Sequence, residues 1–283
     1  MKKVLVLGAK GMAGHVVSQL LPQLGAYKVF SLARDIKENK NTINLDVTHT
    51  DELKKIILDN NFDAIINCIG VLNKDAEDHP DKAIWFNSYF PHFLEAQTKN
   101  TATKIVHIST DCVFSGKKGG YTENDLKDGS GFYAQSKAFG ELNNEKDITL
   151  RTSIIGPELN SSGIGLFHWF MSQENSSEHK GFSKAFWSGI TTIELAKVIH
   201  EILEQNITGL IQITQENKID KYNLLRLFNH VFRSDSLTIV ENSEYEVDKS
   251  MISIRQDFDY KVPSYPKMLE EMKQWISNNN YQY

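Results

Sequence analysis

The chain has 283 residues, of which 40% are hydrophobic and 24% are charged, and its formal net charge is -5. This composition is typical of a globular protein with one large domain or two parts that share a core. The acidic balance argues against a nucleic-acid-binding face, which usually shows as clustered Lys and Arg. No stretch approaches the twenty or so apolar residues that a membrane helix needs, so we expect no membrane partner.

Two cysteines, Cys68 and Cys112, are too few for a disulfide framework and fit a reducing cytoplasm. The apolar run "VLVL" near the N-terminus is too short for the core of a signal peptide. No Cys/His cluster has the spacing of zinc ligands, so we expect no metal. The sequence therefore predicts a cytoplasmic protein.

Strand-like and helix-like segments alternate in the first half of the chain. The expected strands cover residues 2–9, 27–34, 62–70, 104–114 and 148–156, and a short one ends near Asp46. The expected helices cover residues 14–25, 49–61 and 79–100, and a further helix contains Tyr133. We expect Thr50 to cap the second helix and Pro91 to kink the third. Repeated strand–helix units predict an α/β fold, a Rossmann-type doubly wound parallel sheet.

The alternation breaks after Gly156. We expect a loop over 182–192, a helix over 193–205, a strand over 209–214, a helix over 221–232, a short strand over 237–240, and a last helix over 265–278 with a frayed tail. The predicted division is a Rossmann domain, 1–156 with about 189–215, and a smaller substrate lobe, 157–188 with 216–283.

Three glycines lie between the first strand and the first helix. Gly8, Gly11 and Gly14 are three residues apart in "GAKGMAG". Glycines in a loop are often a simple turn, but a strand before and a helix after are the context of a dinucleotide site. Backbone without Cβ atoms lets a pyrophosphate reach the helix N-terminus, where free N–H groups favour an anion.

The end of the second strand bears on which dinucleotide binds. NAD sites usually end this strand with an acid that holds the ribose, whereas here the strand ends "SLARD". Arg34 suits a 2′-phosphate, and Lys10 would add a second positive charge, although both residues could equally be exposed surface. We therefore expect NADP(H). Asp46, followed by Val47, is placed for an adenine contact.

A hydroxyl, a phenol and an ammonium are predicted to converge at one edge of the sheet. Thr110 ends a strand, and Tyr133 and Lys137 lie one turn apart on the next helix. A phenol beside a nicotinamide can give a proton to a carbonyl oxygen as hydride arrives at carbon. We expect the ammonium to lower the phenol pKa, and Thr110 to hold the same oxygen.

The motifs "GAKGMAG", "NCIG", "ISTDCVFSG", "YAQSK" and "RTSIIGP" resemble those of the extended short-chain dehydrogenase/reductases. Within them the chain is most similar to the dTDP-4-dehydrorhamnose reductases and their nucleotide-sugar relatives, strongly to about residue 157 and more loosely after it. The resemblance implies Thr110, Tyr133 and Lys137 as the catalytic triad. The residues that it implies near the cofactor are Gly8, Lys10, Gly11, Met12, Arg34, Asp46, Cys68, Ile69, Gly70 and, on the long helix, Asn87.

The departures from the family pattern concern the substrate. Nucleotide-sugar dehydratases carry Asp-Glu after the threonine, whereas here Asp111 is followed by Cys112, which argues against water elimination. The rhamnose reductases usually have an aromatic residue at the position of Cys112 and another near Ile154. The pocket is therefore expected to differ in shape, and a UDP-linked 4-keto-6-deoxy-N-acetylhexosamine is as plausible as a dTDP-linked sugar.

The second half offers three further candidates for substrate contacts: Trp187 and Ser188 at the pocket mouth, and Arg255 for a diphosphate. The leading hypothesis is an NADPH-dependent reductase of the C4 ketone of a 4-keto-6-deoxy nucleotide-sugar, serving polysaccharide biosynthesis. Two alternatives stay open, a cofactor-binding regulatory subunit without catalysis and a nucleotide-sugar 4-epimerase. The resemblance is compatible with a homodimer as well as with a monomer.

Overall fold

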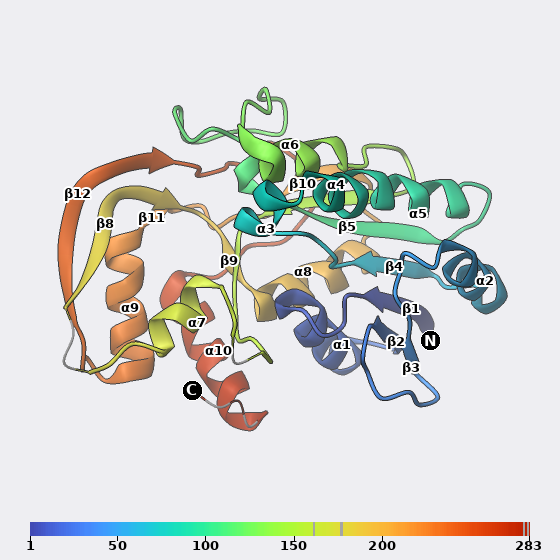
Figure 1. The fold of residues 1–283 in the computed structure, drawn as a ribbon, viewed down its shortest axis with the longest axis horizontal. Coiled ribbons are helices and arrows are strands. Elements are labelled where there is room, and N and C mark those ends of the chain that lie inside the picture. The colour runs from blue at the N-terminus through green and yellow to red at the C-terminus, as the bar shows by residue number, and fades with distance from the viewer. Residues whose placement is uncertain (161, 176–177, 280, 282) are drawn as a thin grey trace.

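A seven-stranded parallel sheet forms the centre of the molecule (Figure 1). The computed structural model describes residues 1–160, 162–175, 178–279, 281 and 283. The strand order is β3-β2-β1-β4-β5-β6-β10, which reverses direction at β1 as in a doubly wound fold. The strands are β1 (Lys2–Leu7), β2 (Tyr27–Ala33), β3 (Thr42–Asn44), β4 (Ala64–Asn67), β5 (Lys104–Thr110), β6 (Ile148–Thr152) and β10 (Gly209–Gln212).

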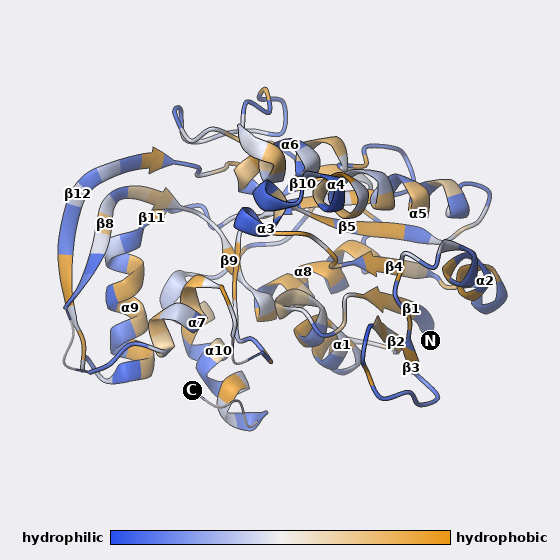
Figure 2. Ribbon diagram, viewed as in Figure 1, coloured by the Kyte–Doolittle hydropathy of each residue, from blue (hydrophilic) through white to orange (hydrophobic). Residues whose placement is uncertain are grey.

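Helices cover both faces of this sheet, because alternate residues of each strand point to opposite sides. Val4 and Val6 of β1 belong to the core under α1 (Met12–Leu24) and α8 (Thr192–Glu204). Leu5 and Leu7 of the same strand pack with α2 (Thr50–Asn60) and α5 (Phe90–Thr98). The apolar colouring of the strands in Figure 2 reflects this double burial. The predicted fold class is confirmed.

The shorter helical segments lie on the α5 side of the sheet (Figure 1). They are α3 (Asn73–Asp78), α4 (Pro80–Ala83), a π-helical segment η1 (Ile84–Tyr89), a 3₁₀ turn η2 (Asp111–Val113) and α6 (Gly131–Phe139). The π-helical segment takes the place of the kink expected at Pro91. Proline has no N–H to bond the carbonyl of Asn87, and the turn before it widens.

A second group of elements lies to the left of the sheet in Figure 1, on the side toward which β1 and β4 point. It comprises β7 (Ile154–Ile155), α7 (Leu166–Met171), β8 (Glu178–Trp187), β9 (Ile190–Thr191), β11 (Ile219–Asp220), α9 (Lys221–Arg233), β12 (Thr238–Asp248) and α10 (Tyr265–Asn278). One hydrophobic cluster includes Val4 of the sheet, Leu224 of α9 and Met268 of α10, so the core continues across the predicted lobe boundary. The two-lobe division stays a prediction.

Three local expectations are wrong. The segment 182–192 is mostly strand rather than loop, because β8 pairs in parallel with β12. α2 already includes Thr50, so the N-cap position falls on His49, which makes no side-chain cap bond. The predicted frayed end is partly ordered, since the Tyr281 hydroxyl lies 2.6 Å from His15 Nε2. Residues 280 and 282 of that end lie outside the described residues.

No helix in the described ranges is both long enough and apolar enough to cross a bilayer.

Candidate active site

The carboxyl ends of β1, β4 and β5 meet at one edge of the sheet. The loop after β1 carries Gly8, whose φ of 79° lies in the left-handed region that favours glycine. Gly11 is the N-cap of α1, and a Cβ atom added there would lie 3.3 Å from the carbonyl oxygen of Gly8. A Cβ at Gly14 would lie only 2.2 Å from that same oxygen. The loop and the first turn of α1 therefore pack against each other without side chains.

Replacing Gly14 by Ala is expected to destabilise the protein by about 1–3 kcal/mol, because the loop backbone must move to admit the methyl group. Chemical unfolding in urea measures the change. Gly11→Ala is the matched control, since the same methyl group there makes a contact that a small adjustment relieves. Equal stability of the Gly14→Ala and Gly11→Ala proteins would contradict this description of the loop.

A cavity of about 380 Å³ opens beside the glycine loop. Nine of the residues expected near a cofactor line it: Gly8, Lys10, Gly11, Arg34, Asp46, Val47, Cys68, Ile69 and Gly70. Phe86, Leu32 and Leu45 also line it, and sequence reasoning missed them. No pattern in the neighbouring sequence distinguishes these apolar side chains from ordinary core residues. Met12 and Gly14, in the first turn of α1, lie outside the lining.

Positive charge gathers at the β2 side of this cavity. The Arg34 side chain is 69% exposed and lies 3.4 Å from the Asp46 carboxylate. Lys10 Nζ donates to the carbonyl oxygen of Asp35 at 2.9 Å. Burial opposes ionisation of Asp46, but hydrogen bonds from Thr48 and the charge of Arg34 together hold its pKa below the usual value. Arg34 is thus free to meet a second anion from solvent.

Tyr133 and Lys137 share one face of α6, as the spacing predicts. The N-terminal turn of α6 is held by Glu77, whose carboxylate accepts from the N–H groups of Phe132 and Tyr133 at 3.0 Å each. Lys137 is 4% exposed, and its Nζ donates to the carbonyl oxygen of Ile108 at 2.7 Å. The ammonium is therefore anchored to β5 directly below the strand end that carries Thr110.

The pKa of Tyr133 is raised rather than lowered, which corrects the sequence expectation. Burial is the largest cause, and the nearby Cys112 and Asp111 add to it, while a hydrogen bond with Thr110 acts in the opposite direction. Burial also lowers the pKa of Lys137 to about 8, opposed by the charges of Glu141 and Cys68. Tyr133 therefore keeps its proton at neutral pH and has a proton to donate.

Asn87 is fully buried and joins the cavity wall to α6. Its amide accepts from Val71 N at 2.8 Å and donates to Val71 O at 2.9 Å and to Ser136 Oγ at 3.0 Å. Its Oδ1 would lie 3.4 Å from a Cβ at Gly70, close to the cavity. The amide is thus committed to protein groups, which makes Asn87 a support for the loop after β4.

Thr110 leads into the turn η2, which carries the next two candidates. The Thr110 hydroxyl donates to Asp111 Oδ1 and accepts from Cys112 N, each at 3.1 Å. Burial raises the pKa of Asp111, although Lys249 and Lys221 lower it. Burial raises the pKa of the Cys112 thiol to about 11, so the thiol is protonated at neutral pH and is a poor nucleophile. The structure brings these residues together with Tyr133.

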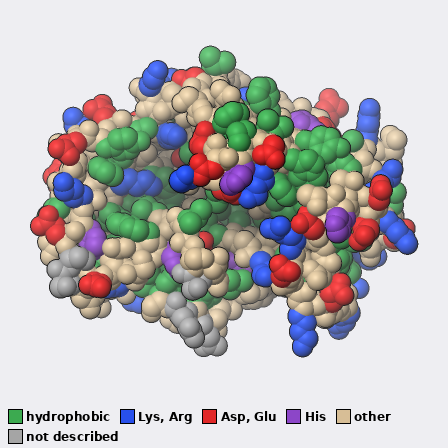
Figure 3. Space-filling model, viewed as in Figure 1, with side chains coloured by type: hydrophobic (Ala, Val, Ile, Leu, Met, Phe, Trp, Pro, Cys, Tyr) green, Lys and Arg blue, Asp and Glu red, His purple; other side chains and the backbone are tan. Residues whose placement is uncertain are grey.

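Two lysines that sequence reasoning missed face this turn. Lys221, the first residue of α9, has its Nζ 5.2 Å from the centre of the Trp187 ring, and both Lys221 and Lys249 act on the Asp111 carboxylate. In Figure 3 this face is hollowed between the part with β8 and α9 and the part with α6, and basic side chains line the hollow.

The remaining sequence candidates divide into two groups. Ile154 on β7 is partly buried against the main core, whereas Trp187 is 3% exposed and donates from Nε1 to Ser153 Oγ at 2.8 Å. Ser188 Oγ accepts from Met251 N at 2.9 Å. Trp187 lies in β8 and Ser188 in the short link to β9, and both side chains are buried, so their place at the pocket mouth stays a prediction.

Arg255 is not brought to the site. Its Nη1 donates to the carbonyl oxygens of Thr208 and Leu210, each at 3.0 Å, at the start of β10. Its Nε donates to Asp257 Oδ1 at 2.6 Å, and Nη2 bonds the other oxygen of the same carboxylate. The guanidinium thus holds the chain after β12 against the sheet edge. Its nitrogens Nε, Nη1 and Nη2 already donate to protein oxygens, so few donors remain for a diphosphate.

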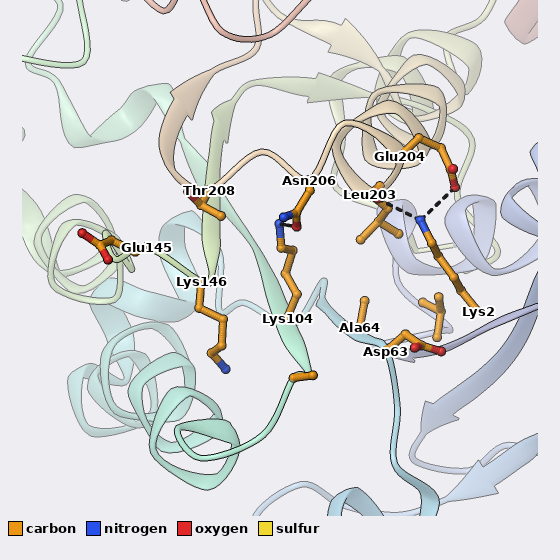
Figure 4. Close-up of a pocket in the computed structure, with 12 residues that line it drawn as sticks. Lys2, Asp63, Ala64, Lys104, Glu145, Lys146, Leu203, Glu204, Asn206 and Thr208 are labelled. Atoms are coloured by element: carbon orange, nitrogen blue, oxygen red, sulfur yellow. Dashed lines mark hydrogen bonds and ion pairs between the residues drawn. The ribbon is translucent and has the colours of Figure 1, made fainter.

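A second cavity, of about 470 Å³, lies at the opposite end of the strands (Figure 4). Three lysines line it, together with Asp63, Glu145 and Glu204. Each lysine is already bonded: Lys2 to Glu204, Lys104 to Asn206 at 2.7 Å, and Lys146 to Thr103 O at 2.7 Å. The charges balance within the lining, so this cavity does not resemble an anion site.

The family model of the RmlD substrate binding domain matches residues 1–245 of the chain. The dTDP-4-dehydrorhamnose reductase of Aggregatibacter actinomycetemcomitans is 35% identical over 159 residues, covering 54% of this chain and 51% of that relative. The chain thus aligns with about half the length of this curated relative. A probable low-salt glycan biosynthesis reductase of Haloferax volcanii is 25% identical over 248 residues, covering 84% of this chain and 82% of the relative.

Solved structures share the fold. The crystal structure of dTDP-4-dehydrorhamnose reductase from Bacillus anthracis str. Ames in complex with NADP superposes with a TM-score of 0.81. The superposition covers 97% of this chain and 99% of that one, at 19% sequence identity.

Proposed function

Because the chain belongs to the RmlD substrate binding domain family, we propose that it is a nucleotide-sugar reductase of the short-chain dehydrogenase/reductase type that uses NADP(H). One observation carries this proposal. A partly buried tyrosine that keeps its proton stands beside an anchored lysine and a strand-end threonine, at the edge where the glycine-loop cavity opens. These are the parts that a carbonyl reduction needs.

The cavity beside the glycine loop fits a phosphorylated dinucleotide. A Cβ at Gly8 or Gly14 would collide with neighbouring atoms, so glycine lets the loop lie against the first turn of α1, where free N–H groups could bind a pyrophosphate. Arg34 and Lys10 supply positive charge at the end of β2, where the 2′-phosphate of NADP would lie. When bound, NADPH supplies the hydride.

The chain's own residues supply the proton and hold the carbonyl. Tyr133 donates its proton to the ketone oxygen, because its raised pKa keeps the phenol protonated at neutral pH. Thr110 Oγ1 is within reach of the phenol, and once its hydroxyl turns from Asp111 Oδ1 to the ketone it holds the same oxygen and orients it. Lys137, fixed to Ile108, stabilises the phenolate that remains. The general acid in such a step contributes roughly 10²–10⁴-fold to the rate.

We propose a 4-keto-6-deoxy nucleotide-sugar as the substrate, reduced at C4 for deoxysugar and polysaccharide biosynthesis. Lys221 and Lys249 face the turn η2, and they support an anionic substrate such as a nucleoside diphosphate sugar. Cys112 and Ile154 leave more room than aromatic residues would. A UDP-linked N-acetylhexosamine and a dTDP-linked hexose such as dTDP-4-dehydrorhamnose are both candidates.

The proposal is tested by NADPH oxidation at 340 nm with freshly made 4-keto-6-deoxy sugars, one dTDP-linked and one UDP-linked and N-acetylated. Each is offered with and without a 3,5-epimerase, and NADH replaces NADPH in a parallel series. We expect consumption with one sugar and a preference for NADPH. NADPH binding without consumption of any sugar would indicate the regulatory alternative, and tightly retained NAD(H) would indicate an epimerase.

A further inference from the structure

A row of buried polar side chains lies behind Lys137. The register of β4 and β5 pairs Asn67 with His107, so the two side chains point to the same face of the sheet. Both residues are 0% exposed. Lys137 reaches this face from α6, and its Nζ lies 3.4 Å from His107 Nε2. The mechanism described above uses neither Asn67 nor His107.

The donors and acceptors of this row can be assigned atom by atom. Asn67 Oδ1 lies 3.1 Å from the backbone nitrogen of Ile69. A backbone N–H can only donate, so the amide oxygen must face it. The amide nitrogen of Asn67 then faces His107 Nδ1 at 3.2 Å, and it too can only donate. His107 Nδ1 is therefore the acceptor and carries no proton.

His107 is a neutral imidazole. Burial is the largest cause that lowers its pKa well below 6.5. A neutral ring carries one N–H, and with Nδ1 unprotonated that N–H is on Nε2. It points at Lys137 Nζ, which already donates to Ile108 O at 2.7 Å. An ammonium has no lone pair to accept this N–H, whereas an amine has one.

We propose that Asn67 fixes His107 as the Nε2–H tautomer, and that the Nε2–H of His107 in turn favours the amine form of Lys137 over the ammonium in the cofactor-free protein. Asn67 and His107 are positioning residues, because they act through Lys137. Burial, which lowers the pKa of Lys137 to about 8, acts in the same direction. The tautomer and the preference for the amine are argued from the geometry, and only their catalytic consequence rests on the proposed function.

The consequence concerns the proton that each reduction consumes. After Tyr133 gives its proton to the ketone oxygen, the phenolate stands beside an amine. The amine binds one proton from solvent and becomes an ammonium, which the phenolate now stabilises by its charge. The ammonium then returns that proton to the phenolate, so one solvent proton is consumed per turnover. The other titratable groups that face this pair are Glu77 of α3, Cys68 after β4, Asp111 and Cys112 of η2, and Glu141 after α6.

The test is nitrogen NMR of the full chain labelled with ¹⁵N-histidine, without cofactor, at neutral pH. The His107 signals are those lost in His107→Gln, or are assigned through backbone connectivity if that variant does not fold. We expect one unprotonated ring nitrogen at Nδ1 and a proton on Nε2. A proton on Nδ1, or an imidazolium, would overturn the proposal whether or not the protein proves to be a reductase.

The variant Asn67→Asp should reverse the tautomer. One carboxylate oxygen accepts from Ile69 N–H and the other from a proton on His107 Nδ1, which leaves Nε2 to accept from an ammonium. We expect His107 to switch to the Nδ1–H form, and the pH at which Lys137 deprotonates, followed by ¹⁵N-lysine NMR, to rise by about one unit or more. The same change in a His107→Phe background measures the effect of the added charge alone. An equally large rise there would contradict a role for the tautomer.

Discussion

Replacing Tyr133 by Phe is expected to lower kcat by roughly 10²–10⁴-fold while leaving the affinity for NADPH nearly unchanged. The change removes one hydroxyl, which in this site is the proton donor to the ketone oxygen. The ring of Tyr133 packs beside Val71, Ala76 and Ala83, and phenylalanine keeps those contacts. Single-turnover kinetics at 340 nm measure the chemical step, and fluorescence titration measures NADPH binding.

Tyr27→Phe is the matched control for this experiment. Tyr27 is also a buried tyrosine with a bonded hydroxyl, which donates to Glu204 at 2.8 Å, but it stands at the start of β2, at the opposite end of the strands from the site. Its replacement costs stability and should leave kcat unchanged. Retention of full turnover by the Tyr133→Phe protein would remove Tyr133 from the mechanism.

Arg151→Met is expected to destabilise the protein by about 3–5 kcal/mol, because it leaves the Glu141 carboxylate buried without its main partner. Arg151 is 1% exposed and bonds Glu141 through Nε at 2.9 Å and Nη2 at 2.8 Å. Ser109 Oγ also donates to Glu141, at 2.8 Å, so the pair supports the end of β5 next to Thr110. Urea unfolding of the variant measures the loss.

The double variant Glu141→Leu with Arg151→Met provides the control. With neither charge left to desolvate, it should be more stable than Arg151→Met alone. Burial opposes ionisation of Glu141, but Arg151 and its other partners hold the pKa below the usual value. The stability that Glu141 contributes is therefore present above its ordinary pKa and is lost as the pH falls through the lowered one. If Arg151→Met lowers the free energy of unfolding by less than about 1 kcal/mol, the ion pair contributes no more than an exposed pair does. That result would contradict the role given to the buried pair of Arg151 and Glu141.

Local patterns predicted the half of the fold that positions the cofactor cavity. The apolar run of β1, the three glycines and the following helix are neighbours in sequence, so their spacing alone predicts the loop. Tyr133 and Lys137 likewise lie within one helix. Each of these features depends on a few consecutive residues, and the structure reproduces all of them.

The second half depends on contacts between distant segments. β8 is a strand because it pairs with β12, about sixty residues further along, and its alternation of buried and exposed residues depends on that packing. Trp187 is buried for the same reason. Lys221 and Lys249 reach the turn η2 from the part of the chain that sequence reasoning assigned to the smaller substrate lobe. The charges that surround Asp111 could not be assigned from spacing.

The pKa of Tyr133 shows the same limit. A tyrosine four residues before a lysine predicts electrostatic support, and the helix does place them together. The depth of burial, which decides the direction of the shift, depends on α3, η1 and η2 packing around α6.

The measurement that tests the account most directly is the fate of the hydride. The enzyme is incubated with NADPH deuterated at the nicotinamide C4 and with the 4-keto-6-deoxy nucleotide-sugar that supports NADPH consumption, and the product is examined by proton NMR. The account predicts deuterium at C4 of the sugar and no proton signal at that position. Deuterium at another carbon of the sugar, or a product without deuterium, would contradict a C4 reduction.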